Sequence, residues 1–240
     1  MADVSIQTPH RLLRGYAASP AGAGPWPGVV VIHDIFGMTD DLRAQADWLA
    51  SAGHVALAPD FFSWGRKIPC LISTMREFQR RKGAVFGDID AARTWLAGRE
   101  DCTGQIGVIG FCMGGGFALL MAAGHQFAVS SVNYGWVPSD VETIVGGACP
   151  IVASFGKKDS DLRGAAARLE HALHARGIAC DVKEYADAGH AFMNRHDNML
   201  VRVATVLRGA GYHEPSAADA RQRILAFFAR HLAGVPSSAL

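Results

Sequence analysis

The residues of this chain best suited to covalent chemistry form the motif Gly110-Phe111-Cys112-Met113-Gly114. A β-branched run precedes the motif and a helix-like apolar run follows it, so Cys112 lies at a strand-to-helix turn. The pattern is that of a nucleophile elbow with Cys in place of Ser. Because such an elbow is strained, its neighbours two residues away must lack bulk, as glycines do. The motif predicts a Cys112 nucleophile, a thiolate stabilised by the helix N-terminus, and a Met113 amide that binds an oxyanion.

Two other interpretations of this turn stay open. A glycine-rich turn between a strand and a helix could bind a phosphate, although neither G-x-G-x-x-G nor G-K-[ST] occurs at this turn. A cysteine in an apolar context is also commonly a core residue. We expect that role for the four cysteines outside the motif: Cys70, Cys102, Cys149 and Cys180.

A thiol nucleophile needs a base, and the base needs an acid to orient it. With a nucleophile elbow, the acid and then the histidine follow the nucleophile along the chain. Asp159 and His190 each follow a strand-like segment, so we predict Asp159 as the acid and His190 as the base. Asp161 is a rival acid, Asp159 could instead cap the next helix, and His190 could be a surface loop residue.

A second oxyanion donor should come from the loop after an early strand. The strand-like run Val29–His33 leads into such a loop, where Gly37 allows the backbone to turn. The backbone amide of Ile35 is therefore the predicted second donor.

Strand-like and helix-like segments alternate along the chain. This order predicts one α/β domain over residues 1–240, with a mostly parallel sheet and helices on both faces. The capping-box-like Ser216–Asp219 predicts the start of the last helix. The expected strands are Val29–His33, His54–Ala58, Ile106–Ile109, Val129–Tyr134, Ile151–Phe155 and Cys180–Tyr185, and the expected helices are Thr39–Ser51, Ser73–Ala97, Cys112–Ala123, Leu162–Arg176 and Ser216–Leu232.

Composition indicates an ordinary globular protein with no nucleic-acid or membrane partner. Of the 240 residues, half are hydrophobic and 19% are charged, and the net charge is +1. The five cysteines include no C-x-x-C pair, and neither a signal peptide nor a membrane-spanning stretch is recognisable. We expect a cytoplasmic monomer or small homo-oligomer that has free thiols and needs no metal or other cofactor.

Six motifs spread over residues 29–192 resemble those of the dienelactone hydrolase family of small α/β-hydrolases. The resemblance implies a triad of Cys112, Asp159 and His190 that hydrolyses an enol-lactone through a thioester, without a metal. The motifs are VVVIHDIFGM from Val29, GHVALAPDFF from Gly53, GDIDAARTWL from Gly87, IGVIGFCMGGGFAL from Ile106, FGKKD from Phe155 and AGHAF from Ala188.

The chain departs from this family at positions that control the thiol and the substrate. Asp34 stands where the family has a glutamate that holds the resting thiol, and it is one methylene shorter; it could instead face water. The family binds a substrate carboxylate with two arginines, one of them four residues after the histidine. That position is Asn194 here, with Arg195 next to it. The other arginine could be Arg76, Arg80 or Arg81.

The expected substrate is an activated ester or an enol-lactone. A thiolate expels an enolate or phenolate more readily than an alkoxide, because sulfur is otherwise the better leaving group. The displaced arginine indicates that a neutral or weakly acidic compound is processed at least as well as a carboxylated dienelactone. Five aromatic residues could line the site or could equally be core residues: Phe36, Phe61, Phe62, Trp64 and Phe192. The tail Asn194–Pro215 could also form one side of the site.

Two further classes of function stay open for this chain. It could be a non-catalytic small-molecule binder or a redox sensor that uses the thiol of Cys112, although a sensor would need neither His190 nor Asp159 in that order. It could also be an acyltransferase that passes the acyl group to an acceptor other than water. The sequence does not separate acyl transfer from hydrolysis.

Overall fold

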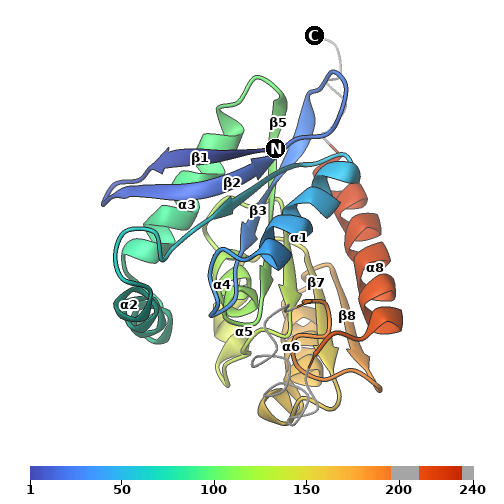
Figure 1. Cartoon of the computed structure of the whole chain (residues 1–240). Coiled ribbons are helices and arrows are strands. Elements are labelled where there is room, and N and C mark those ends of the chain that lie inside the picture. The colour runs from blue at the N-terminus through green and yellow to red at the C-terminus, as the bar shows by residue number, and fades with distance from the viewer. Residues whose placement is uncertain (196–210, 234–240) are drawn as a thin grey trace.

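The computed structural model describes residues 1–195 and 211–233, and an eight-stranded sheet forms its centre (Figure 1). The strand order is β1-β2-β4-β3-β5-β6-β7-β8. Strand β2 is antiparallel to both of its neighbours, and all other pairs are parallel. The predicted α/β fold with a mostly parallel sheet is therefore confirmed. The strands are β1 Ala2–Gln7, β2 Leu12–Ala18, β3 Trp26–Ile32, β4 Val55–Pro59, β5 Cys102–Phe111, β6 Val129–Asn133, β7 Ile151–Gly156 and β8 Cys180–Tyr185.

Helices cover both faces of the sheet, as predicted. A Cβ on Gly28 of β3 would contact Leu96 of α3, whereas a Cβ on Gly107 of β5 would contact Leu232 of α8. Gly107 pairs with Val29, the residue after Gly28, so these two contacts lie on opposite faces of the sheet. The helices are α1 Asp40–Ser51, α2 Lys67–Arg80, α3 Ala84–Ala97, α4 Met113–Met121, α5 Val141–Ile144, α6 Ala165–Ala175 and α8 Glu214–Leu232, with a 3₁₀ turn at Ser160–Leu162.

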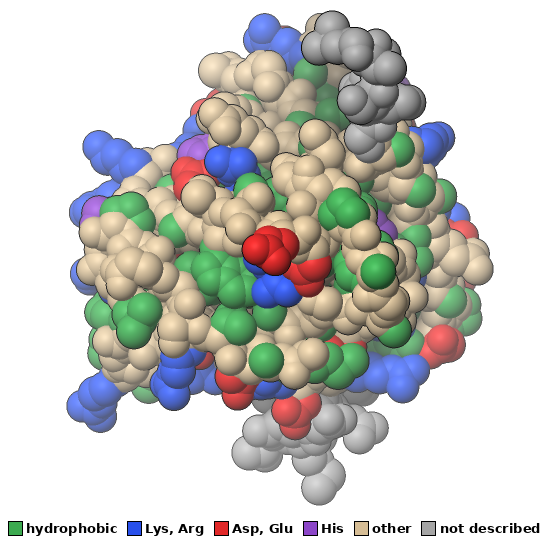
Figure 2. Space-filling view, turned by 90° about the horizontal axis from the view of Figure 1, so that it is seen from above, with side chains coloured by type: hydrophobic (Ala, Val, Ile, Leu, Met, Phe, Trp, Pro, Cys, Tyr) green, Lys and Arg blue, Asp and Glu red, His purple; other side chains and the backbone are tan. Residues whose placement is uncertain are grey.

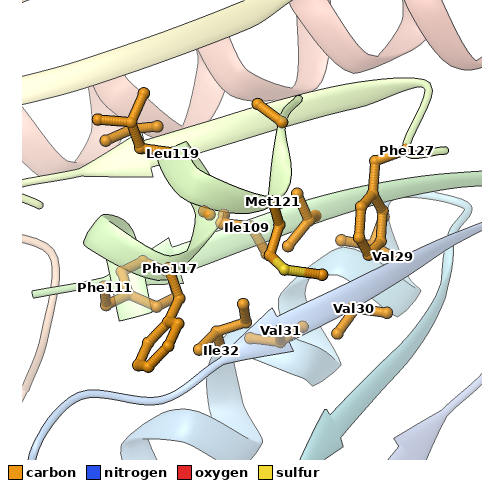
Figure 3. Packing of buried hydrophobic residues seen from close by; sticks show 14 of the residues in the cluster. Val29, Val30, Val31, Ile32, Ile109, Phe111, Phe117, Leu119, Met121 and Phe127 are labelled. Atoms are coloured by element: carbon orange, nitrogen blue, oxygen red, sulfur yellow. The ribbon is translucent and has the colours of Figure 1, made fainter. Parts of the chain in front are cut away.

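The central strands are apolar because both of their faces are covered. All residues of β4, β6 and β7 are buried, which explains why β4 and most of β7 are continuous rather than alternating apolar runs. The polar residues of β6, Ser130, Ser131 and Asn133, make hydrogen bonds within the protein. Figure 3 shows Phe117 and Met121 of α4 directed toward β3 within the same buried cluster. This packing fixes α4, and with it the turn that precedes α4, against the middle of the sheet.

Three predicted helix boundaries are wrong, each for a local reason. The expected helix Ser73–Ala97 is two helices, because Arg81 adopts a left-handed conformation (φ 54°) and Gly83 has φ 141°. Gly164, with φ 72°, delays α6 to Ala165. The last helix begins at Glu214 with a proline in its first turn. Ser216 therefore lies inside that helix and is not its cap.

Charged groups of both signs are interspersed with hydrophobic and neutral groups on the face shown in Figure 2. This distribution agrees with the small net charge of the sequence. None of the helices within residues 1–195 and 211–233 has the length and hydropathy that crossing a bilayer requires.

The parallel strands end at one edge of the sheet, where ligand sites of open α/β sheets form. Each predicted chemical residue follows the end of a strand by a few positions. Ile35 follows β3, Cys112 follows β5, Asp159 follows β7 and His190 follows β8. The fold thus brings residues that are far apart in sequence to one edge.

Candidate active site

Cys112 occupies a strained turn between β5 and α4. Its backbone angles are φ 54° and ψ −116°, which non-glycine residues rarely adopt. The Cys112 N–H donates to the carbonyl of Asn133 at 3.1 Å, and the Cys112 carbonyl accepts from the amide of Gly116 at 3.2 Å. These bonds on both sides of the residue hold the turn in place and leave the thiol partly exposed.

The glycines around Cys112 are required by close backbone approach. A Cβ on Gly110 would lie 1.9 Å from the carbonyl oxygen of Gly114. A Cβ on Gly114 would lie 2.3 Å from the carbonyl oxygen of Ile32. The neighbouring atoms are backbone atoms that cannot rotate away, so any side chain at these positions would open the turn.

His190 and Asp159 are in direct contact. Nδ1 of His190 lies 2.6 Å from Oδ2 of Asp159, and Asp159 is 5% exposed. The second carboxylate oxygen of Asp159 accepts from the amide of Asp161 at 3.1 Å. Asp159 thus caps the 3₁₀ turn and also holds the histidine, so the cap and acid interpretations are compatible. The side chain of its rival Asp161 is exposed.

The loops after β7 and β8 touch along their backbones, which fixes the distance between Asp159 and His190. The amide of Lys158 donates to the carbonyl of Ala188 at 2.9 Å. A Cβ on Gly156 would lie 2.5 Å from the carbonyl oxygen of Gly189. Glycine at 156 therefore lets the second loop approach closely enough for the carboxylate to reach the imidazole.

The surroundings of His190 favour its protonated form. Burial by itself would lower the pKa of His190, but hydrogen bonds with Asp159 and Cys112, together with their charges, raise it to about 10. The structure therefore brings the thiol, the imidazole and the carboxylate together. Burial raises the pKa of each of the other four thiols, that of Cys149 to about 12, which disfavours their thiolates: Cys70, Cys102, Cys149 and Cys180.

Tyr134, which sequence reasoning missed, packs beside His190. It directly follows β6, and its ring lies edge-on to the imidazole with 5.4 Å between centroids. Its hydroxyl donates to Oδ1 of Asn194, and Nδ2 of Asn194 donates to Asp41 at 2.5 Å. This chain of hydrogen bonds ties the histidine loop to the first turn of α1. The one sequence signal that could have identified Tyr134 was its position at the end of the expected strand Val129–Tyr134.

Of the positions considered for the family's arginines, Asn194, Arg195 and Arg81 are engaged within the protein. The other two candidates, Arg76 and Arg80, are exposed on α2. Asn194 is 3% exposed, and its amide makes the two bonds just described. Arg195 donates to Tyr212 at 2.9 Å and to Glu214 at 2.7 Å. Arg81 makes two bonds to the carboxylate of Asp140, at 2.5 and 2.7 Å.

The loop after β3 carries the second predicted amide. Asp34 is 8% exposed, so the alternative of a water-facing aspartate is wrong; its Oδ1 accepts from the amide of Phe36 at 2.7 Å. Ile35 is exposed. Of the proposed apolar walls, Phe36 is half-buried and Trp64 is exposed. The guanidinium carbon of Arg11 lies over the Trp64 ring, 4.6 Å from the ring centroid. The other proposed walls are core residues: Phe61, Phe62 and Phe192.

Within the described part of the chain, His, Cys, Asp and Glu side chains nowhere form a group of three suited to a metal ion. The part of the predicted wall at residues 196–210 lies outside the described residues.

Comparison with known proteins gives a consistent set of relatives. The sequence model described as "Dienelactone hydrolase family" matches residues 13–232. A carboxymethylenebutenolidase of Rhodococcus opacus is 27% identical, over 96% of this chain and 93% of its own length. A Salmonella typhimurium protein provisionally given the same name is 29% identical, over 90% and 82%. A Klebsiella pneumoniae crystal structure, provisionally named a dienelactone hydrolase, is 27% identical with a TM-score of 0.78, covering 95% of this chain and 98% of its own.

Proposed function

This chain belongs to the dienelactone hydrolase family of hydrolases, and from that premise we propose that it cleaves neutral, activated esters and lactones through a thioester on Cys112. The observation that carries the proposal is the contact of three groups at one sheet edge. Cys112 occupies the strained turn, its thiol interacts with His190, and His190 is bonded to buried Asp159. This is the arrangement that an activated thiol nucleophile requires.

The proposed reaction begins with the proton of Cys112 on His190. The raised pKa of His190 supports an imidazolium at neutral pH, and Asp159 accepts a hydrogen bond from its Nδ1–H. The sulfur electron pair attacks the carbonyl carbon, and the carbonyl oxygen becomes an oxyanion. The amides of Ile35 and Met113 donate to that oxygen.

Collapse of this intermediate re-forms the carbonyl and breaks the bond to the leaving oxygen. His190 donates its Nε2 proton to that oxygen, which leaves as an enol, phenol or alcohol, and the acyl group remains on sulfur. His190 then takes a proton from water, and the hydroxide attacks the thioester. The second collapse releases the carboxylic acid, and the thiolate–imidazolium pair is restored.

The leaving group decides which substrates a thiolate can cleave. A tetrahedral intermediate expels whichever group leaves more easily, and sulfur leaves more easily than a simple alkoxide. An enolate or phenolate competes successfully with sulfur. We therefore propose enol-lactones and aryl or enol esters as the substrate class, in preference to alkyl esters and amides.

The engagement of two of the four candidate arginines supports a neutral substrate. Arg195 and Arg81 each bond to a carboxylate of this protein, so a substrate carboxylate would have to displace Glu214 or Asp140. Asn194 carries no charge, is buried, and already uses its side-chain amide in hydrogen bonds within the protein. The contacts of Arg195, Arg81 and Asn194 thus give less support for binding a carboxylated dienelactone than the contacts of Cys112, His190 and Asp159 give for the proposed reaction.

The test is the pre-steady-state reaction with excess p-nitrophenyl acetate, followed by mass spectrometry of the protein. We expect a burst of p-nitrophenolate, one acetyl group on Cys112, and loss of both after iodoacetamide treatment. Cys112→Ala should lose the burst, whereas Cys149→Ala, a matched change at a half-buried thiol, should retain it. Turnover by Cys112→Ala, or acetyl on another residue, would disprove the proposal. A binder or redox sensor would show no turnover, and an acyltransferase would prefer an added alcohol over water.

A further inference from the structure

His33 is a fully buried histidine at the start of the loop that carries Ile35. It directly follows the last residue of β3 and is 0% exposed. Its ring packs against Phe61 and Phe62, with centroid distances of 5.1 and 4.6 Å. The reaction described above gives this imidazole no task, although burying a polar ring requires compensating hydrogen bonds.

Both ring nitrogens of His33 have backbone partners that fix where its hydrogen lies. Nδ1 is 2.6 Å from the carbonyl oxygen of Asp34, and a carbonyl only accepts, so Nδ1 carries the hydrogen. Nε2 is 3.2 Å from the amide of Phe61, which only donates, so Nε2 carries none. Burial also lowers the pKa of His33, in keeping with one neutral tautomer.

The carbonyl that His33 holds belongs to the same peptide unit as the amide of Ile35. In a planar trans peptide the C=O and N–H bonds point in opposite directions. A donor that fixes the Asp34 carbonyl on one side therefore fixes the direction of the Ile35 N–H on the other. The amide of Gly37 donates to the same carbonyl at 3.3 Å and closes the turn.

We infer that His33 is a positioning residue that aims the Ile35 amide at the substrate oxyanion. The inference rests on the proposed function, because it concerns the oxyanion site of that reaction. His33 touches neither the substrate nor the reacting atoms and acts only through the Asp34–Ile35 peptide. Without the Nδ1 donor, the Asp34 carbonyl keeps the longer bond from the Gly37 amide, so the peptide is held less firmly and the direction of the Ile35 N–H is no longer fixed.

Two substitutions separate the functions of the two ring nitrogens. The side-chain amide of His33→Asn occupies the place of Nδ1, so it retains a donor for the Asp34 carbonyl. The longer amide of His33→Gln reaches the place of Nε2, so it retains an acceptor for the Phe61 amide. Each variant removes one of the two hydrogen bonds that the ring makes to the backbone, so both are expected to lose stability.

The two measurements are kcat/KM for p-nitrophenyl acetate and the rate of Cys112 alkylation by iodoacetamide. Alkylation displaces iodide from a saturated carbon and forms no oxyanion, so it reports the thiolate without the oxyanion site. We expect His33→Gln to lower kcat/KM by about 10²-fold, as for loss of an oxyanion donor, with alkylation unchanged. His33→Asn should retain most of the wild-type kcat/KM.

His54→Gln is the control for altering a buried histidine. His54 is 6% exposed and packs against Phe228 with 6.0 Å between centroids. It precedes β4, at the opposite end of that strand from the site. Its substitution should lower the unfolding midpoint but leave the ratio of hydrolysis to alkylation at the wild-type value.

Three results would overturn the role of His33. These are wild-type kcat/KM in folded His33→Gln, an equal fall of hydrolysis and alkylation, and an equal loss in the Asn and Gln variants. If neither variant folds, ¹⁵N NMR of the wild-type imidazole decides, because an Nε2–H tautomer could not donate to Asp34. Failure of the proposed function is distinguishable, since it would appear in the wild type as a missing thioester.

Discussion

Two regions at the carboxyl edge of the sheet are built in opposite ways. One is the proposed reaction centre, formed by Cys112, Asp159 and His190 and called the reaction centre below, and the other is the arginine rim, formed by Arg81 and Arg195. Asp159 is 5% exposed and its loop is bonded to the histidine loop, whereas the side chain of Arg195 is 63% exposed. The carboxylate of Asp159 is thus shielded from water, whereas the ion pairs of the arginine rim are screened by it.

This difference indicates which property of the protein is harder to change. A substitution at Gly110 or Gly114, beside the reaction centre, meets backbone atoms, and a substitution at Asp159 removes the partner of His190. A substitution in the arginine rim breaks surface ion pairs, which contribute little to stability. We therefore expect the proposed type of reaction to be harder to change by substitution than the identity of the substrate.

The largest effect is expected for Asp159→Asn in the reaction centre. An asparagine can donate toward Nδ1 and favour the wrong imidazole tautomer, which lowered kcat by about 10⁴-fold in a serine protease. We expect a fall of the same order in kcat for p-nitrophenyl acetate. Asp161→Asn, the neighbouring exposed position, should retain wild-type kcat, and the reverse pattern would assign the acid role to Asp161.

The same variant should alter the pH dependence of stability. The folded-state pKa of His190 is raised from 6.5 to about 10, so its protonation stabilises the fold fully below about pH 6.5. That stabilisation is lost as the pH rises toward 10. Removing the Asp159 charge lowers the pKa of His190, so urea denaturation of Asp159→Asn should show a smaller loss over this interval. An unchanged slope would mean that Asp159 does not raise the pKa of His190.

A smaller effect is expected for Tyr134→Phe, at the boundary between the two regions. The ring stays against His190, but Oδ1 of Asn194 loses its buried donor, which costs about 1–3 kcal/mol of unfolding free energy. Urea denaturation should show this loss while kcat falls less than about tenfold. In the control Tyr185→Phe, the lost hydroxyl donates to half-exposed Asp219 and accepts from Arg223, which keeps its bond to the carboxylate of Asp181, so the loss should be smaller. Equal losses would show that burial of the Asn194 amide is unimportant.

The sequence predicted those features that depend on local pattern. Apolar runs identified the six parallel strands, and strand ends identified Asp159 and His190, which lie in contact; their catalytic roles stay predictions. Features that depend on distant partners were not predictable. Tyr134 and Asn194 are 60 residues apart, and Asn194 and Asp41 are 153 apart. Nothing near Tyr134 in the sequence indicates that its hydroxyl reaches the histidine loop.

The smallest effect is expected for Arg195→Ala in the arginine rim. Arg195 already bonds to Tyr212 and Glu214, and a guanidinium displaced by one residue aims differently from the family's carboxylate clamp. We therefore expect kcat/KM for a neutral phenyl or enol ester to be unchanged, and kcat/KM for a carboxylated dienelactone to change little. Both substrates should be measured on the wild type and on Arg195→Ala.

Arg43→Ala is the matched control for this substitution, since Arg43 also makes an exposed ion pair, with Asp3 at 2.7 Å. The decisive quantity is the wild-type preference for the dienelactone over the neutral ester. Suppose that this preference exceeds about a hundredfold, near 2.7 kcal/mol of transition-state binding, and that Arg195→Ala erases the preference. That result would contradict the proposal that the substrate is neutral. Arg195 would then leave Glu214 to bind the substrate, and the arginine rim would determine specificity as firmly as the reaction centre determines chemistry.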